Sequence, residues 1–147
     1  MKIMAALDLS DYAEFVLIKA IKTAKQQNAK MDIVVVAEDH SDERDFAECE
    51  RAGEKLLQDA TRAARSYQQK ALAQGVKAKV RVRSGKSTAE EIIKYQQSEN
   101  LDLIVLGRRS PAARRGTCPI GAVAQRVVAY ATCTVMVVRC MEKCHLC

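Results

Sequence analysis

The sequence predicts an α/β fold, a five-stranded parallel sheet with helices on both faces. Short apolar, β-branched runs alternate with segments of helical period along the chain, which is the order expected for such a sheet. Most of these runs are apolar at consecutive positions, as in strands that are covered on both sides. The chain has 147 residues, 48% of them hydrophobic and 29% charged. This composition fits one globular domain with its own core, and it excludes a disordered chain.

The chain opens with a strand, a helix and a second strand. The run "KIMAALD" (2–8) predicts the first strand, and its short apolar stretch without a cleavage pattern is not a signal peptide. Asp11 and Glu14, three residues apart, predict a capping box at the start of a helix. The β-branched run "MDIVVVAE" (31–38) predicts the second strand.

A long helix is predicted from about residue 41 to residue 74, and Gly75 is its natural C-terminal stop. Its apolar residues alternate steps of three and four, which makes one stripe along the helix. The predicted stripe consists of Phe46, Cys49, Gly53, Leu56, Ala60, Ala63 and Tyr67.

The second half of the chain completes the alternation. In "VKAKVRVRSG" (76–85), valine alternates with polar residues, which predicts a half-exposed edge strand. Ser87 and Glu90 form a second capping box before a helix that runs to about Glu99. The remaining predicted elements are strands at 101–107 and 133–139, with a helix at 120–131 between them.

A parallel sheet with helices on both faces reverses its winding at one point, and ligands bind in the crevice at the carboxyl ends of the strands there. Asp8 ends the first predicted strand and Gly107 ends the fourth. If these strands are neighbours, both residues face that crevice. The helix that starts near Gly121 then directs its free N–H groups at the same place, where they favour an anion.

Four arginines lie in the loop between the fourth strand and this helix: Arg108, Arg109, Arg114 and Arg115. The net charge is +6, and no acidic residue occurs among residues 108–118. This distribution indicates a local anion site more than a nucleic-acid surface. A guanidinium group matches phosphate oxygens in pairs. The alternative is that all four side chains are solvated on the loop.

The sequence resembles the universal stress protein family over residues 1 to 139. The segments that carry the resemblance are "AALDLSDYAEFVLIKAI", "SGKSTAEEII", "LDLIVLG" and "GAVAQRVVAYATCTVMVVR". The resemblance implies an open Rossmann-like sandwich of the adenine nucleotide hydrolase-like kind. It also implies a homodimer through the last strand, Thr134 to Arg139, and, in one branch of the family, binding of an adenine nucleotide, ATP or AMP.

The nucleotide-binding branch carries the motif G-x2-G-x9-G-[ST], and this chain departs from it. Gly107 matches the first glycine, but Ser110 stands in place of the second. Ten residues separate Ser110 from Gly121, and Ala122 occupies the hydroxyl position. The missing hydroxyl would donate to a phosphate oxygen, a hydrogen bond worth about 1.5–3 kcal/mol.

The resemblance also assigns residues to a binding site. Asp8 would contact the adenine and ribose side, although a turn acceptor at the strand end is an equal alternative. Val36 or Ala37 would wall the base. The residues expected around the ribose and phosphates are Leu106, Gly107, Arg109, Ser110, Gly121, Ala122 and Val123.

The segment "CMEKCHLC" follows the family-like domain as a separate tail, residues 140–147. Thiolates and an imidazole are the ligands of zinc and other soft metals, and this tail offers Cys140, Cys144, His145 and Cys147. The alternative is a reduced tail with incidental thiols. Cys133 is expected to act as a small apolar residue, and Cys118, among the arginines, is the more reactive thiol if it is exposed.

No nucleophile–base pair or carboxylate pair is predicted to meet in the crevice, so we expect a binding protein and not an enzyme. The first hypothesis is a nucleotide-responsive stress protein of the cytoplasm. A signalling or structural dimer with an empty crevice is the second, and a metal or thiol sensor built on the tail is compatible with both. An RNA-binding accessory protein is the weakest interpretation, because aromatic residues make up only 4% of the chain and none lies near the arginine loop.

Overall fold

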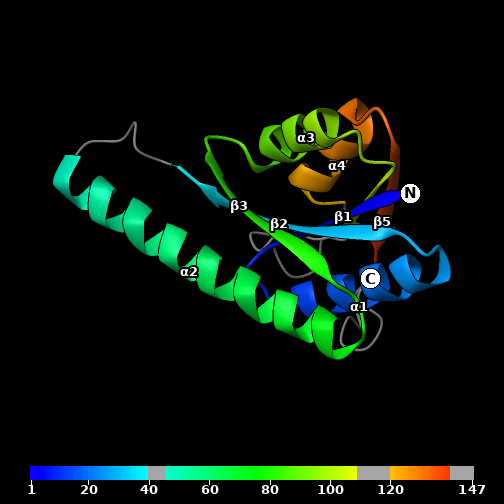
Figure 1. Cartoon of the computed structure of the whole chain (residues 1–147). Helices are drawn as coiled ribbons and strands as arrows, with labels where there is room; N and C mark the ends of the chain where they lie inside the picture. The colour runs from blue at the N-terminus through cyan, green and yellow to red at the C-terminus, as the bar shows by residue number, and fades with distance from the viewer. Residues whose placement is uncertain (40–45, 109–119, 140–147) are drawn as a thin grey trace.

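The computed structural model describes residues 1–39, 46–108 and 120–139, with the backbone alone for residues 46–49. The chain forms a five-stranded parallel sheet, which confirms the predicted α/β fold (Figure 1). The strands are β1 (Lys2–Leu7), β2 (Lys30–Glu38), β3 (Ala78–Gly85), β4 (Leu103–Gly107) and β5 (Thr134–Val138). The helices are α1 (Ala13–Gln26), α2 (Phe46–Ala73), α3 (Thr88–Glu99) and α4 (Ala122–Tyr130).

The strand order is β3-β2-β1-β4-β5, so the winding of the sheet reverses at β1. Helices α1 and α2 cover one face and α3 and α4 cover the other, as Figure 1 shows. The carboxyl ends of β1 and β4 are neighbours, as the sequence predicted, with Ala6 paired to Leu106. The fold therefore opens one crevice at the edge where these two strands end.

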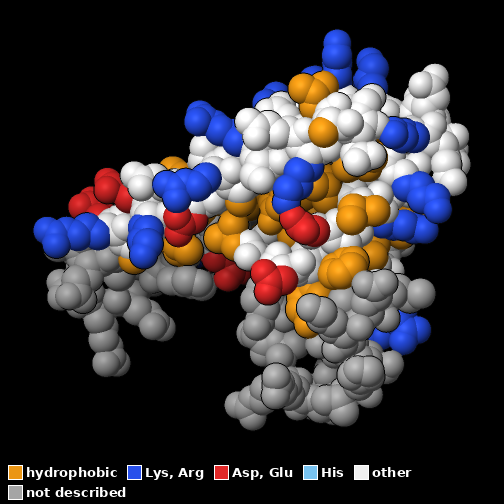
Figure 2. Space-filling view, turned by 90° about the horizontal axis from the view of Figure 1, so that it is seen from below, with side chains coloured by type: hydrophobic (Ala, Val, Ile, Leu, Met, Phe, Trp, Pro, Cys, Tyr) orange, Lys and Arg blue, Asp and Glu red, His pale blue; other side chains and the backbone are white. Residues whose placement is uncertain are grey.

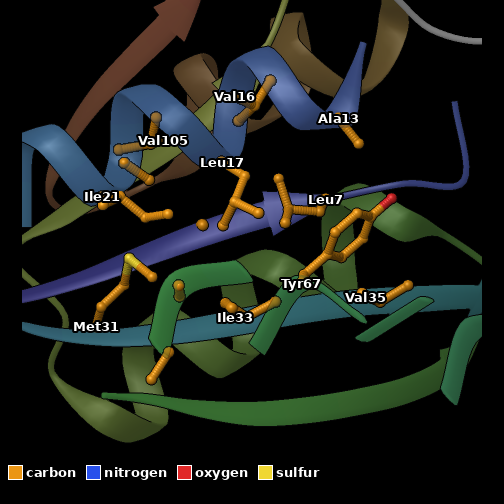
Figure 3. Packing of buried hydrophobic residues seen from close by; sticks show 14 of the residues in the cluster. Leu7, Ala13, Val16, Leu17, Ile21, Met31, Ile33, Val35, Tyr67 and Val105 are labelled. Atoms are coloured by element: carbon orange, nitrogen blue, oxygen red, sulfur yellow. The ribbon is translucent and has the colours of Figure 1, made fainter. Parts of the chain in front are cut away.

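The core on the α1 and α2 face is made of alternate residues of the central strands. Val16, Leu17 and Ile21 of α1 point towards the sheet in Figure 3, where they pack with Leu7 and Val105. The two fully buried β2 residues Ile33 and Val35 continue the same layer. Among the described residues, no helix is long and apolar enough to cross a membrane.

The buried stripe of helix α2 differs from the stripe that the sequence predicted. Its fully buried residues are Ala60, Ala64, Tyr67 and Ala71, whereas Leu56 is 37% exposed and Ala63 is only partly buried. The helix has 28 residues, about 42 Å at 1.5 Å per residue, and the longest described strand has 9 residues, about 30 Å. Only the C-terminal part of α2 can therefore cover the sheet, and the N-terminal part extends past it (Figure 1).

The predicted capping boxes have opposite outcomes. The prediction for Asp11 is wrong: α1 begins after Tyr12, and no side chain in the described part of the chain caps its N-terminus. Ser87 does cap α3, since its hydroxyl accepts a hydrogen bond from the Glu90 N–H at 3.4 Å.

Gly75 ends α2 with a positive φ of 83°, a conformation that glycine adopts without steric cost. β3 is an edge strand, as predicted.

A buried polar pair joins the sheet to α3. The Tyr95 hydroxyl donates to Asp32 Oδ2 at 2.7 Å, and the two residues are 3% and 8% exposed. Arg83 lies 5.7 Å from the centre of the Tyr95 ring. Burial raises the pKa of Tyr95, and the hydrogen bond to Asp32 raises it further.

Tyr95→Phe is expected to lower the free energy of unfolding by about 1.5–3 kcal/mol at neutral pH, because a buried carboxylate loses its donor. Folded Tyr95 keeps its proton above the unfolded pKa of about 10, so this stabilisation is complete below that pH and is lost as pH rises through the folded pKa. The substitution should therefore also reduce the loss of stability above about pH 10. Urea unfolding at neutral and alkaline pH measures both effects. Tyr130→Phe, at a residue 66% exposed, is the matched control and should change little.

Candidate functional site

A cavity of about 490 Å³ lies at the carboxyl edge of the sheet, where β1 and β4 end. It extends over the strand ends onto both faces of the sheet. Its lining comes from all the described elements except β3 and β5: Ala6, Leu7, Asp8, Leu9, Ser10, Tyr12, Ala13, Val16, Val34, Val36, Glu38, Leu56, Thr88, Ile92, Leu106, Gly107, Val123 and Ala124.

The inner part of the cavity is apolar. Ala6 is paired with Val34 on one side and with Leu106 on the other, so these three side chains share the α3 and α4 face of the sheet. Ile92 of α3 and Ala124 of α4 line the cavity from that face. The small Ala6 side chain stands between two larger ones, which leaves a hollow with apolar walls.

Asp8 forms a turn where β1 ends. Its Oδ1 accepts hydrogen bonds from the Ser10 backbone N–H, at 2.9 Å, and from the Ser10 hydroxyl. The Tyr67 hydroxyl of α2 donates to the Asp8 carbonyl at 2.6 Å. Burial raises the pKa of Tyr67, and the negative charges of Asp8 and Glu14 raise it further, so this donor stays protonated. Asp8 is thus the turn acceptor that the sequence left as an alternative, held in place at the cavity wall.

The wall formed by β2 carries a second carboxylate. Glu38 Oε1 accepts from the Thr88 hydroxyl at 2.7 Å and from the Thr88 N–H at 3.3 Å. Thr88 is the first residue of α3, where the helix dipole favours a negative charge. This pair joins the end of β2 to the start of α3 across the cavity.

The end of β4 is fixed on two sides. The Arg108 N–H donates to the Val138 carbonyl at 3.0 Å, and the Arg108 carbonyl accepts from the Gly121 N–H at 2.7 Å. A Cβ at Gly107 would lie 3.3 Å from Val16 Cγ2, so glycine allows α1 to approach the strand closely here. These contacts place the start of α4 beside the end of β4.

Among the described residues, no side chain caps the N-terminus of helix α4. Gly121 is the N-cap residue, and the first turn has no acidic residue. The first N–H groups of any α-helix lack partners within the helix. Val123 and Ala124, from that first turn, line the cavity. The positive end of the α4 dipole is therefore available to a negative group.

The structure brings five of the predicted site residues to the cavity lining: Asp8, Val36, Leu106, Gly107 and Val123. Ala37 is 7% exposed and belongs to the core on the opposite face of the sheet. Gly121 and Ala122 lie at the start of α4, outside the lining.

The predictions for Arg109 and Ser110 fall outside the described residues, as do those for Arg114, Arg115 and Cys118 and for the metal ligands Cys140, Cys144, His145 and Cys147. In the described part of the chain, no group of three or more His, Cys, Asp or Glu side chains could hold a metal ion.

Several lining residues were missed by the sequence analysis. Ser10 had a local signal, since an Asp followed two residues later by Ser is typical of a turn. Thr88 had one as well, because it directly follows the capping residue Ser87. Ala6 and Glu38 had none, since their roles depend on neighbours from other strands and helices.

The charged side chains in the described lining of the cavity are carboxylates. Asp8 and Glu38 belong to it, whereas the described residues contribute no Lys or Arg. Figure 2 shows hydrophobic and acidic side chains in the hollow beside α2, with one Lys or Arg side chain next to an acidic one there and others around the periphery.

Residues 1–139 match the family model described as the Universal stress protein family. The chain is 27% identical to the universal stress protein YxiE of Bacillus subtilis (strain 168), over 94% of this chain and 98% of that protein. Among solved structures, universal stress protein UspA of Lactobacillus plantarum has a TM-score of 0.85 at 23% identity, over 95% of this chain and 97% of the other. The universal stress protein of Archaeoglobus fulgidus in complex with dAMP has a TM-score of 0.66 at 19% identity, over 93% and 96%. On the match over residues 1–139, this chain belongs to the universal stress protein family.

Proposed function

We propose that this protein binds an adenine nucleotide, AMP or ATP, in the cavity between the ends of β1 and β4. The observation that carries the proposal is the shape of the cavity, an apolar hollow beside a helix N-terminus that no described side chain caps. The universal stress protein of A. fulgidus, which has the same fold and was solved in complex with dAMP, adds support.

The described residues suggest an orientation for the nucleotide. The base is proposed to lie in the apolar hollow against Val34, Val36 and Ile92. The ribose then lies near Asp8 and Gly107, because these residues border the hollow where β1 and β4 end. The phosphate is directed at the first turn of α4, which favours an anion. Binding is the proposed role, with no chemical step on the nucleotide.

Isothermal titration calorimetry with AMP and ATP tests this proposal, with GMP as the control for the base. We expect saturable binding of at least one adenine nucleotide, and no accumulation of ADP or phosphate when ATP is incubated with the protein. Denaturation of freshly purified protein, followed by mass analysis, detects nucleotide that is retained during purification. An absence of retained nucleotide, together with no heat of binding at about 1 mM AMP or ATP, contradicts the proposal.

A homodimer through β5 is the second proposal, and it stands whether or not the cavity holds a nucleotide. β5 forms one edge of the sheet and consists of apolar residues after its first threonine. These residues are only partly buried in the single chain. Apolar surface at a strand edge is stabilised when a second copy covers it.

Val137→Lys is expected to convert the dimer to a monomer, because it places a charge on that edge. Val137 belongs to neither core cluster, so the fold should tolerate the change. Light scattering after size-exclusion chromatography should show the mass fall from twice 16.3 kDa to 16.3 kDa. Ile18→Lys, at a residue 63% exposed on α1, is the control and should leave the mass of the dimer unchanged. A monomeric wild-type protein contradicts the proposal.

A further inference from the structure

The second edge of the sheet, β3, differs from β5 in its chemistry. β3 pairs with β2 along all 8 of its residues, from Ala78 to Gly85, and no other described strand pairs with it. Figure 1 shows β3 at the front of the sheet with α2 running beneath it. An edge of this length offers a row of backbone hydrogen-bonding groups to another chain.

The direction of these groups follows from their partners. The Gly85 carbonyl accepts from the Asp39 N–H at 2.8 Å, so the peptide groups of Gly85 face β2. The N–H and C=O of one strand residue point to the same side, and the side alternates along the strand. The residues whose backbone groups face outwards are therefore Ala78, Val80, Val82 and Ser84.

Side chains already bind the first two outward carbonyls. Gln68 Nε2 donates to the Ala78 carbonyl at 2.9 Å, and a guanidinium nitrogen of Arg81 donates to the Val80 carbonyl at 3.2 Å. No described residue binds the outward N–H groups of Val80, Val82 and Ser84, which leaves them for a partner. The exposed edge consequently offers three donors, the N–H groups of Val80, Val82 and Ser84, and two acceptors, the carbonyls of Val82 and Ser84.

Cationic side chains surround these donors. One groove lies between α2 and the β3 edge, and a second, lined by α2 residues alone, shares Thr61 and Arg65 with it. Every charged residue in their described lining is Lys or Arg: Arg62, Arg65, Lys79 and Arg81. Arg62, Arg65 and Lys79 form no ion pair with any residue that the structure describes. Backbone donors and unpaired cations together suit a ligand that supplies carbonyl and carboxylate oxygens.

We propose that the β3 edge binds an extended acidic segment of a partner protein, which adds a sixth strand to the sheet. The backbone of the segment accepts hydrogen bonds from the outward N–H groups of Val80 and Val82. Its acidic side chains pair with the cations of the two grooves. Strand addition supplies affinity through the backbone, and the charges select the partner.

A fluorescent peptide of about ten residues that alternates Glu with Val, blocked at both ends, is a suitable probe for this site. We expect anisotropy to report saturable binding at low salt, and a Lys-Val peptide of equal length to bind far more weakly. Hydrogen exchange of the Val80, Val82 and Ser84 amides should slow when the Glu-Val peptide is bound. Unchanged exchange at these amides contradicts strand addition.

Two sets of substitutions test the cationic side chains and the backbone donors of the site separately. Arg65→Glu with Lys79→Glu should weaken peptide binding at least about tenfold, whereas Lys22→Glu with Lys25→Glu, the same charge change on α1, should alter it less than about twofold. Val82→Pro removes one outward N–H and leaves the cations in place, and proline is tolerated on an edge whose N–H faces solvent.

We expect Val82→Pro to weaken binding about tenfold with unchanged circular dichroism. Binding that survives Val82→Pro but not the charge reversals identifies a simple cationic patch and overturns the proposal. A further outcome overturns the proposal: the wild-type protein self-associates at this edge, and the charge reversals at Arg65 and Lys79 abolish that association. The edge is then occupied by a second copy of the chain.

Discussion

Replacing Ala6 with phenylalanine is expected to weaken adenine nucleotide binding about a hundredfold or more, close to 3 kcal/mol. Ala6 lies between Val34 and Leu106 on the floor of the cavity, and it is the small residue of that row. A phenyl ring there occupies the volume that we assign to the base. Calorimetry with AMP, under the conditions used for the wild type, measures the effect.

Two further variants make the Ala6 result interpretable. Ala52→Phe adds the same ring at an exposed position of α2 outside the cavity lining and should leave binding unchanged. Overpacking at Ala6 itself costs about 1–3 kcal/mol of stability, which urea unfolding reveals. If Ala6→Phe does not fold, Ala6→Val, with a smaller side chain, should still weaken binding about tenfold. Nucleotide binding of wild-type strength in either folded Ala6 variant excludes this cavity as the site.

Replacing Ile104 with alanine is expected to lower the free energy of unfolding by about 3–4 kcal/mol. Ile104 is 0% exposed and lies on β4, paired with Met4 of β1 and with Val135 of β5. The central position of the strand leaves the surrounding backbone little room to collapse into the cavity that the substitution creates. Such a loss is a large fraction of the roughly 5–15 kcal/mol that stabilises a typical domain.

Urea unfolding at a fixed protein concentration measures the loss at Ile104, and its m-value should stay unchanged. Val128→Ala removes apolar atoms from a residue 52% exposed and should change stability by no more than about 0.5 kcal/mol. A loss below about 1 kcal/mol at Ile104 contradicts the packing described for β4.

The sequence predicted those features that depend on neighbours a few residues away. The apolar runs and helical periods yielded every described strand and helix, and Ser87 and Gly75 were correctly placed at helix ends. Asp11 failed as a cap although its spacing to Glu14 is right. Asp8 and Ser10 form a turn just before it, and α1 starts later than a capping box at Asp11 requires.

The candidate site was harder to predict, because a strand alternates its side chains between two faces. Val36 and Ala37 are adjacent in sequence, yet Val36 lines the cavity and Ala37 lies in the opposite core. The register between β1 and β2 decides which of these two residues points towards α3. The composition of the strand does not reveal it. A register shift of one residue would exchange them.

By itself, the sequence determined the order of the elements, the parallel sheet and the edge where a ligand is expected, since local periodicity and the connections between strands decide these. The tertiary structure alone decided which side chains meet there: Tyr67 with the Asp8 carbonyl, Glu38 with Thr88, and Tyr95 with Asp32. The partners in these contacts are 59, 50 and 63 residues apart. Contacts over such separations depend on strand order, register and helix placement together, and no local pattern in the chain records all three.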